Sequence, residues 1–411
     1  MADLEYRTGV RGAACMMRYI WRECTMNVRG LQKSMREYGM YFALLIIMVF
    51  FTILTNGVFI SPRNISNLFD QMGYIAVLGV GMTLILIIRS IDISVGFVCG
   101  LTGAILATGL KGGTIPPVLV VLLVLSVGIM IGVYHGFLVT KLFMPAWVVS
   151  LAGMFVFRGA LLLVTEGTGT IIVDNPFFVA LGNGFIPDLL GGGKVHGLTM
   201  LLAGIAIVLL VVSMSLQRAQ VKKYGLDAGP TVLFLAKILI ISSIILFFAW
   251  QLANYRGLSW TVVVVIVVVA IYHFFMSNTI LGRHIYAVGA NPEAAELSGV
   301  KVKSVTFFVL ISMSFLAAVA GILYTARLMS ASTSAGNGFE MDAIAAAYIG
   351  GVSASGGIGK VTGTIIGAIV ISSLSSGMNL LQVGVSYQYI IRGLVLVIAV
   401  LFDVQSRKRL Q

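Results

Sequence analysis

Long apolar runs follow one another along this 411-residue chain, and short polar segments separate them. A helix needs about 20 apolar residues to cross the hydrocarbon core of a bilayer, and such runs recur from Gly39 to Val404. Runs such as Thr261 to Ala270 present apolar residues on every face, whereas the strands of a membrane barrel alternate apolar and polar residues. The pattern therefore predicts an all-α, polytopic membrane bundle over residues 39–404, with no soluble domain inside it.

Twelve apolar segments can be placed along the chain. One of them, Glu340 to Val352, is short enough to be a half-helix or a re-entrant segment. We therefore expect about 10 to 12 transmembrane helices, which is either twelve crossings or ten crossings and one re-entrant pair. The segments run from Tyr41 to Ile60, Met72 to Ile88, Ile93 to Leu110, Ile115 to Val139, Ala146 to Thr165, Leu198 to Ser215, Val232 to Leu252, Leu258 to Ser277, Ser304 to Tyr324, Glu340 to Val352, Val361 to Leu380 and Tyr387 to Val404.

The basic residues indicate how the bundle is oriented. Cytoplasmic loops are enriched in Lys and Arg, and every crossing changes side. If the amino terminus is cytoplasmic, the later basic clusters all fall on the inside as well, so both termini are expected there. The net charge of +12 therefore marks orientation and not nucleic-acid binding. The clusters are Lys141, then Arg218 with Lys222 and Lys223, then Arg283 with Lys301 and Lys303, and finally Arg407, Lys408 and Arg409 in the tail of residues 405–411.

Three connecting segments carry further expectations. Residues 1–38 are basic, with arginines at helical spacing, which favours an amphipathic helix on the cytoplasmic leaflet over a flexible basic tail. This segment is too long and too polar to precede a cleaved signal sequence. Residues 166–197, rich in Gly and Pro, form the longest outside connection, which is either a docking surface for a partner or a simple connector. The polar stretch from Arg218 to Pro230 is expected to be an inside loop.

Composition argues against catalysis and metal binding. The three cysteines and four histidines are scattered along the chain, so neither a disulfide framework nor a metal site is indicated. No cluster of carboxylates or histidines converges within the apolar segments, which makes a membrane-embedded enzyme the weakest of the functional classes.

A polar break between two apolar segments, Arg89 to Gly96, holds the most unusual candidates. A carboxylate at the centre of a span costs about 2.5 to 3.5 kcal/mol unless it is paired or hydrated, which makes Asp92 and its neighbour Ser94 candidates for a substrate pathway. The alternative is that Asp92 caps a helix that begins at Ile93. Arg158, deep in its own span, is expected to face the interior and form an ion pair.

Residues 279–303 contain a second polar pattern, on the cytoplasmic side by the charge argument. Asn291 is a good helix N-cap, Pro292 and Glu293 suit the first turn, and Gly299 suits the end. A short capped helix outside the membrane is therefore expected. The Ala294–Ala295 pair would let such a helix seat in a groove of another protein, which a simple connector does not need.

Three motifs together resemble the permease subunits of bacterial ATP-binding-cassette (ABC) importers for monosaccharides such as ribose and galactose, and especially those for xylose and for multiple sugars. They are Asp92-Ile-Ser-Val-Gly96, the loop from Gly289 to Gly299, and Ala345 to Ser353 followed by Gly356, Gly357, Gly359 and Gly363. The resemblance covers nearly the whole chain from Tyr41. The stretch Gly356 to Val361 is not a nucleotide loop, because it lacks the spacing and the final hydroxyl of one.

This resemblance implies a type II-like importer permease in the bacterial inner membrane, in contact with membrane lipids. It implies that two identical copies form the pathway and that a periplasmic sugar-binding protein delivers the sugar. It also implies that ATP and Mg²⁺ bind to a separate ATPase subunit, and that the permease binds no cofactor itself. The coupling helix that docks on this ATPase would comprise Asn291, Pro292, Glu293, Ala294, Ala295, Glu296, Leu297 and Gly299.

Further pathway candidates lie near the last two spans. A sugar needs hydroxyl and amide groups as hydrogen-bond partners and aromatic faces for stacking. Each of these residues could instead hold two helices together. An ion-coupled secondary transporter stays the alternative function, although the titratable groups that it needs at mid-membrane are sparse. The candidates are Tyr348, Ser375, Ser376, Asn379 and Gln382.

Overall fold

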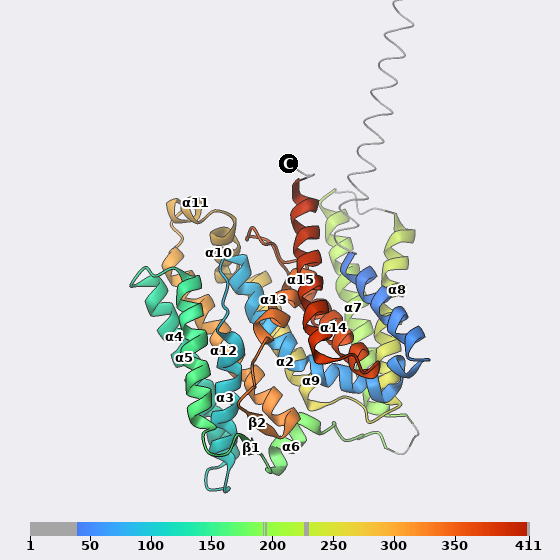
Figure 1. Cartoon of the computed structure of the whole chain (residues 1–411). Coiled ribbons are helices and arrows are strands. Elements are labelled where there is room, and N and C mark those ends of the chain that lie inside the picture. Colours follow the sequence, from blue (N-terminus) through green and yellow to red (C-terminus); the bar gives the residue numbers. More distant parts are fainter. Residues whose placement is uncertain (1–38, 192, 194, 226–229, 409–411) are drawn as a thin grey trace, which may run out of the picture.

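The computed structural model describes residues 39–191, 193, 195–225 and 230–408 (Figure 1). The predicted amphipathic helix of residues 1–38 lies outside the described residues. Two ends of the bundle can be distinguished in Figure 1: the α11 side, where α10 and α11 lie, and the sheet side, where β1 and β2 lie.

Within the described residues, eight helices are long and apolar enough to cross a membrane, and three shorter apolar helices accompany them. The shorter three are Gly39–Leu54, α3 (Val95–Leu110) and the apolar part of α15 (Val385–Lys408). The expectation of a polytopic helical bundle is confirmed. The eight long helices are α2 (Pro62–Ile87), α4 (Pro117–Thr140), α5 (Ala146–Val164), α7 (Gly197–Lys223), α8 (Thr231–Ala253), α9 (Trp260–Asn278), α12 (Val302–Leu328) and α14 (Val361–Leu380).

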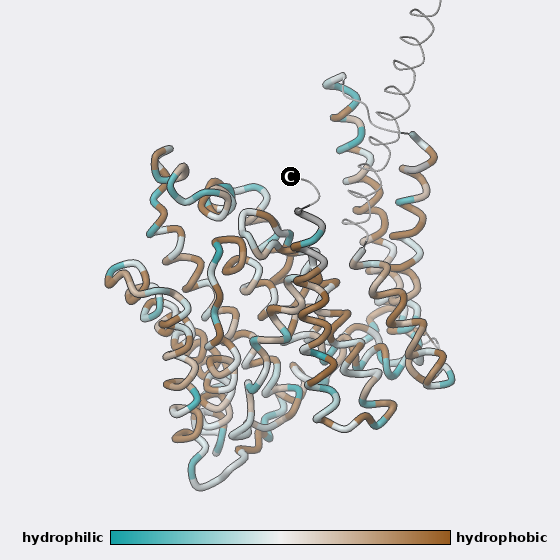
Figure 2. Tube along the Cα trace, turned by 45° about the horizontal axis from the view of Figure 1, so that its top comes forward, coloured by the Kyte–Doolittle hydropathy of each residue, from teal (hydrophilic) through white to brown (hydrophobic). Residues whose placement is uncertain are grey.

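The buried centre of the bundle consists of α2, α12 and α14, while α7 and α8 bury little of their surface within the chain. Figure 2 shows hydrophobic residues along the sides of the bundle and hydrophilic residues toward its ends. Three glycines at four-residue intervals in α4 lie against α12: Gly128, Gly132 and Gly136. A Cβ at Gly132 would come within 2.5 Å of the Cα of Ile311, so only glycine permits this close approach.

The start of the bundle differs from the prediction. The first helix ends at Leu54 and not at Ile60, because Asn56 and Gly57 have left-handed backbones with φ of 51° and 85°. A short 3₁₀ helix, η1 (Val58–Ile60), follows. The second span begins at Pro62, ten residues before the predicted Met72, since proline fits a first helical turn.

The predicted connections also contain more structure than expected. The stretch 166–197 includes β1 (Thr170–Ile172) and α6 (Pro176–Asn183), whose N-cap Asn175 accepts a hydrogen bond from the Phe177 amide. Strand β1 pairs antiparallel with β2 (Ser330–Ser332). Helix α7 continues to Lys223, so the first part of the expected polar loop is helical. Helix α15 likewise runs to Lys408 and includes most of the predicted tail.

Of the three remaining helices, two lie on the α11 side and one lies within the bundle. α10 (Ile280–Ala290) and α11 (Pro292–Leu297) follow α9, and only Asn291 separates them. α13 (Phe339–Ile349), which covers most of the segment expected to be a half-helix, has eleven residues and packs against α2, α14 and α15.

Candidate functional site

The short helix α11 lies at the edge of the molecule, outside the long spans (Figure 1). The Asn291 side chain accepts a hydrogen bond from the Ala294 amide at 3.1 Å, which satisfies one of the free donors of the first turn. The helix ends where Gly299 takes a left-handed backbone, with φ of 87°. The local geometry is thus the one that the sequence pattern predicts.

Helix α11 exposes both charge and apolar surface. Glu293 and Glu296 are exposed, and the Leu297 side chain is 91% exposed. Ala295 is buried at 5% and packs toward the rest of the molecule, so only Ala294 of the alanine pair faces outward. An exposed leucine next to two exposed carboxylates is a surface that another protein can cover.

The polar break after α2 is folded and buried. Asp92 accepts hydrogen bonds at one carboxylate oxygen, Oδ1, from the Ser94 amide at 2.9 Å and from the Ser94 hydroxyl at 2.6 Å. Helix α3 begins at Val95 with Ser94 as its N-cap residue. The alternative in which Asp92 caps a helix that begins at Ile93 is therefore wrong by two residues, since Asp92 instead closes the turn before the helix.

The other oxygen of Asp92, Oδ2, faces a histidine. It lies 4.0 Å from Nδ1 of His135 on α4, and both side chains are at most 2% exposed. Gly153 on α5 makes room for the ring, because a Cβ there would come within 2.6 Å of the imidazole Nε2. Asp92 and Ser94 are thus enclosed by α3, α4 and α5 in this conformation and do not line an open path.

Arg158 lies on an exposed face of α5, which corrects the expectation of an interior ion pair. Its guanidinium stands 5.6 Å from the centre of the Phe97 ring. Within the described part of the chain, no carboxylate comes within salt-bridge distance of it. The reason is helical phase: α5 buries Gly153, Phe157 and Leu161, and Arg158 follows Phe157 by about 100° around the helix.

Two ion pairs, each with a buried carboxylate and a partly exposed arginine, were not anticipated from the sequence. Asp342 on α13 pairs with Arg392 on α15 at 3.1 Å, and Arg392 also donates to the Ser375 hydroxyl of α14 at 2.9 Å. Asp70 on α2 lies 3.5 Å from Arg327 near the end of α12. A carboxylate and an arginine inside otherwise apolar runs were the available signals, but their pairing depends on the tertiary fold.

Comparison with known proteins assigns the chain to a class of transporter. Residues 64–400 match the family described as the permease component of the branched-chain amino acid transport system. The chain belongs to this permease family. It is therefore a multi-pass membrane permease and not an enzyme.

Curated relatives of this permease include sugar permeases. It is 34% identical to the xylose transport system permease protein of Haemophilus influenzae, over 92% of this chain and 98% of the relative. The xylose permease of Escherichia coli K12 is also 34% identical, over 92% and 93%. The ribose import permease protein of Haemophilus influenzae is 32% identical, over 88% and 91%. No solved structure matches the permease significantly.

The remaining pathway candidates of the permease lie between α14 and its neighbours. Ser375 accepts from Arg392, Ser376 donates to the Asn64 side chain at 3.1 Å, and Asn379 accepts from Gln388 at 2.9 Å. These contacts hold helices together in the present conformation. Gln382 lies exposed in the turn before α15, with φ of 55°, and Tyr348 on α13 is half-buried.

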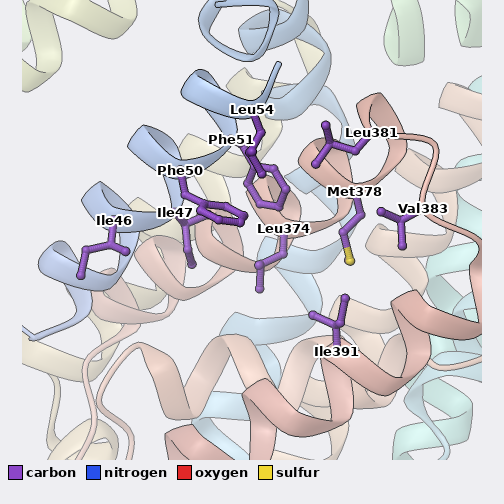
Figure 3. A pocket seen from close by; sticks show the side chains of 10 residues that line it. All are labelled: Ile46, Ile47, Phe50, Phe51, Leu54, Leu374, Met378, Leu381, Val383 and Ile391. Atoms are coloured by element: carbon purple, nitrogen blue, oxygen red, sulfur yellow. The ribbon is translucent and has the colours of Figure 1, made fainter. Parts of the chain in front are cut away.

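A cavity of about 440 Å³ lies between the first described helix, α14 and α15 (Figure 3). All of its lining side chains are apolar, and in Figure 3 those of the first helix face those of the two later helices. A sugar site needs polar groups that orient hydroxyls, so this cavity is not suited to a sugar. Its lining comprises Ile46, Ile47, Phe50, Phe51, Leu54, Leu374, Met378, Leu381, Val383 and Ile391.

Proposed function

We propose that this permease imports a monosaccharide across the bacterial inner membrane, driven by ATP hydrolysis on a separate ATPase subunit. The observation that carries the proposal is α11, a capped helix outside the spans that exposes a leucine and two carboxylates. A permease that worked alone would not need this surface. The sugar class follows from relatives whose names specify xylose and ribose and which align over almost their whole length.

The docking partner is defined by the chemistry of α11. Glu293 and Glu296 call for basic groups, and Leu297 calls for an apolar pocket that is dry once filled. The ATPase subunit supplies such a groove. ATP with Mg²⁺ binds elsewhere on that subunit and not on the permease. Closure of two ATPases around ATP would then displace α11 on two copies of the permease.

A second copy of the permease completes the pathway in this proposal. The α11 side is cytoplasmic, as are both termini, and the sheet side faces the periplasm. There, β1, β2 and α6 form a folded surface that a sugar-loaded binding protein can contact. Asp92, Ser94, Ser375 and Ser376 are buried in this conformation, so they contact sugar only after α3 and α14 move. Tyr348, Asn379 and Gln382 lie nearer the surface and complete the proposed set.

The test is ATP hydrolysis in proteoliposomes that contain the permease and its ATPase. A panel of pentoses and hexoses is added with and without a periplasmic binding protein. Stimulation by one loaded binding protein supports the proposal and identifies the sugar. Uptake that follows a proton or sodium gradient and ignores ATP refutes it and favours the secondary-transporter alternative.

A variant of α11 tests the docking role directly. Replacement of Glu293–Leu297 by an unrelated segment, or the single change Leu297→Asp, should abolish stimulated hydrolysis while membrane insertion is retained. Tyr224→Asp is the matched control, because Tyr224 is 77% exposed and caps the end of α7. That end of α7 lies on the same side of the bundle as α11 but away from it (Figure 1). Normal uptake by the Leu297→Asp variant would contradict the docking role.

A further inference from the structure

Helix α11 is tied to the interior of the permease by one arginine. Arg89 follows α2, and its Nε donates to the carbonyl oxygen of Gly289 at 2.7 Å. Its Nη2 donates to the carbonyl of Ala290. These carbonyls belong to the last turn of α10, where no helical partner is available and the helix dipole is negative. A planar guanidinium that serves two such carbonyls fixes the direction in which α10 leads into α11.

The connection between α13 and α14 is built into the same junction. The Gly357 amide donates to the carbonyl of Ile87 at 2.9 Å, and the Tyr286 hydroxyl of α10 donates to the carbonyl of Gly359 at 2.7 Å. A Cβ at Gly289 would overlap the Ile87 carbonyl, and one at Gly356 would overlap the Arg89 side chain. Glycine at these two positions therefore permits the close packing of this junction.

The left-handed backbone of Arg89 indicates that this position is kept for its arginine side chain. Arg89 has φ of 61°, a left-handed conformation that glycine adopts freely and that a side chain opposes. Backbone strain of this kind persists where surrounding contacts hold the residue in place, and it is found where it is part of a mechanism. Glycine would relax the backbone at this position but would leave the two carbonyls of α10 without the guanidinium.

We propose that Arg89 is a positioning residue that makes α11, the end of α2 and the α13–α14 connection move as one unit. The inference rests on the proposed function, in which an ATPase displaces α11. Arg89 lies three residues before Asp92, and α13 carries Asp342. A displacement of α11 therefore reaches the buried polar break and the Asp342–Arg392 pair through the same junction.

The first test compares Arg89→Gly with the wild-type permease in proteoliposomes with the ATPase and the loaded binding protein. Arg89→Gly should insert and hydrolyse ATP, while the sugar transported per ATP falls at least about tenfold, the factor that one charge-assisted hydrogen bond is worth. Arg89→Lys keeps the positive charge but not the planar guanidinium that donates to two carbonyls, so the sugar transported per ATP should fall by less. Arg283→Gln, an exposed arginine on α10, should transport like the wild type.

The second test needs no partner subunit and separates this inference from the proposed function. Spin labels at Ser298→Cys and Ser355→Cys, with Cys15 and Cys24 replaced by serine, report the distance between α11 and the α13–α14 connection. We expect a narrow distance distribution in the wild-type background and a broad one with Arg89→Gly. Equal distributions, or an unchanged amount of sugar transported per ATP, would overturn the inference. Absence of stimulated hydrolysis in the wild type would instead count against the proposed function.

Discussion

The buried pair between Asp342 and Arg392 should be a major local contribution to the stability of the bundle. Asp342 is 3% exposed, and its partner at 3.1 Å also donates to Ser375, so three helices meet at this one guanidinium. Removal of one member leaves the other charge buried without a partner. Breaking a buried pair in this way costs about 3 to 5 kcal/mol.

The Arg392 side chain is 29% exposed, so water screens the pair and makes it weaker than a fully buried one. We therefore expect Arg392→Ala to lower the free energy of unfolding by about 3 kcal/mol, at the low end of that range. Asp342→Asn should cost less, because the amide oxygen still accepts a hydrogen bond from the arginine. The measurement is reversible unfolding in mixed detergent micelles, followed by tryptophan fluorescence.

A double-mutant cycle decides whether the pair itself is responsible. With both Asp342→Ala and Arg392→Ala, the loss should be smaller than the sum of the single losses by at least about 1 kcal/mol, since no charge is left unpaired. Arg158→Ala is the control, and loss of its contact with Phe97 should cost only about 0.5 to 1 kcal/mol. If each single variant loses less than about 1 kcal/mol and the two losses add in the double variant, this reasoning is refuted.

Three further predictions concern glycine packing, acid sensitivity and capping. Gly132→Ala forces α4 away from the backbone of α12 and should lower the melting temperature in detergent, whereas Gly159→Ala, with open space around it, should not. Backbone amides, first among them that of Gly197, hold the pKa of Asp188 below its usual value of 3.8, so its capping of α7 is complete above that pH and is lost as the pH falls through the lowered pKa. Protection of the Gly197 amide from exchange, relative to its intrinsic rate at each pH, should therefore fall in acid, and Asp188→Asn should remove that dependence. Asn291→Ala should weaken the start of α11 by about 1 kcal/mol and speed amide exchange at Ala294, with little change elsewhere.

Much of the fold could be predicted because the membrane imposes long apolar runs. The predicted span from Val361 to Leu380 coincides with α14, and the one from Ala146 to Thr165 differs from α5 by one residue. The start of α2 was missed because its first turns carry Asn64 and Asp70. Their partners, Ser376 and Arg327, are more than 250 residues away in sequence, so no local window could show that these polar groups are satisfied.

In the candidate site as well, local contacts could be predicted and long-range contacts could not. The ends of α11 could be predicted because Asn291 and Gly299 act within one turn of their own positions. The role of Arg89 could not, since the carbonyl that it binds lies 200 residues further along. Arg158 was misplaced for a related reason: a charge within a span indicates that it must avoid lipid, but not which face of α5 the chain buries.

The pairing of β1 with β2 sets an order on biosynthesis. Thr170 pairs with Ser332, and at about 5 to 20 residues per second the ribosome needs roughly 8 to 30 s to make the residues between them. During that interval the segment around β1 and α6 waits outside the bilayer without its partner strand. Truncated chains that end before Ser330 should therefore be cleaved in this segment by an added protease, and chains that extend beyond α13 should resist. The late strand therefore completes the sheet side of the bundle only after α12 has been made.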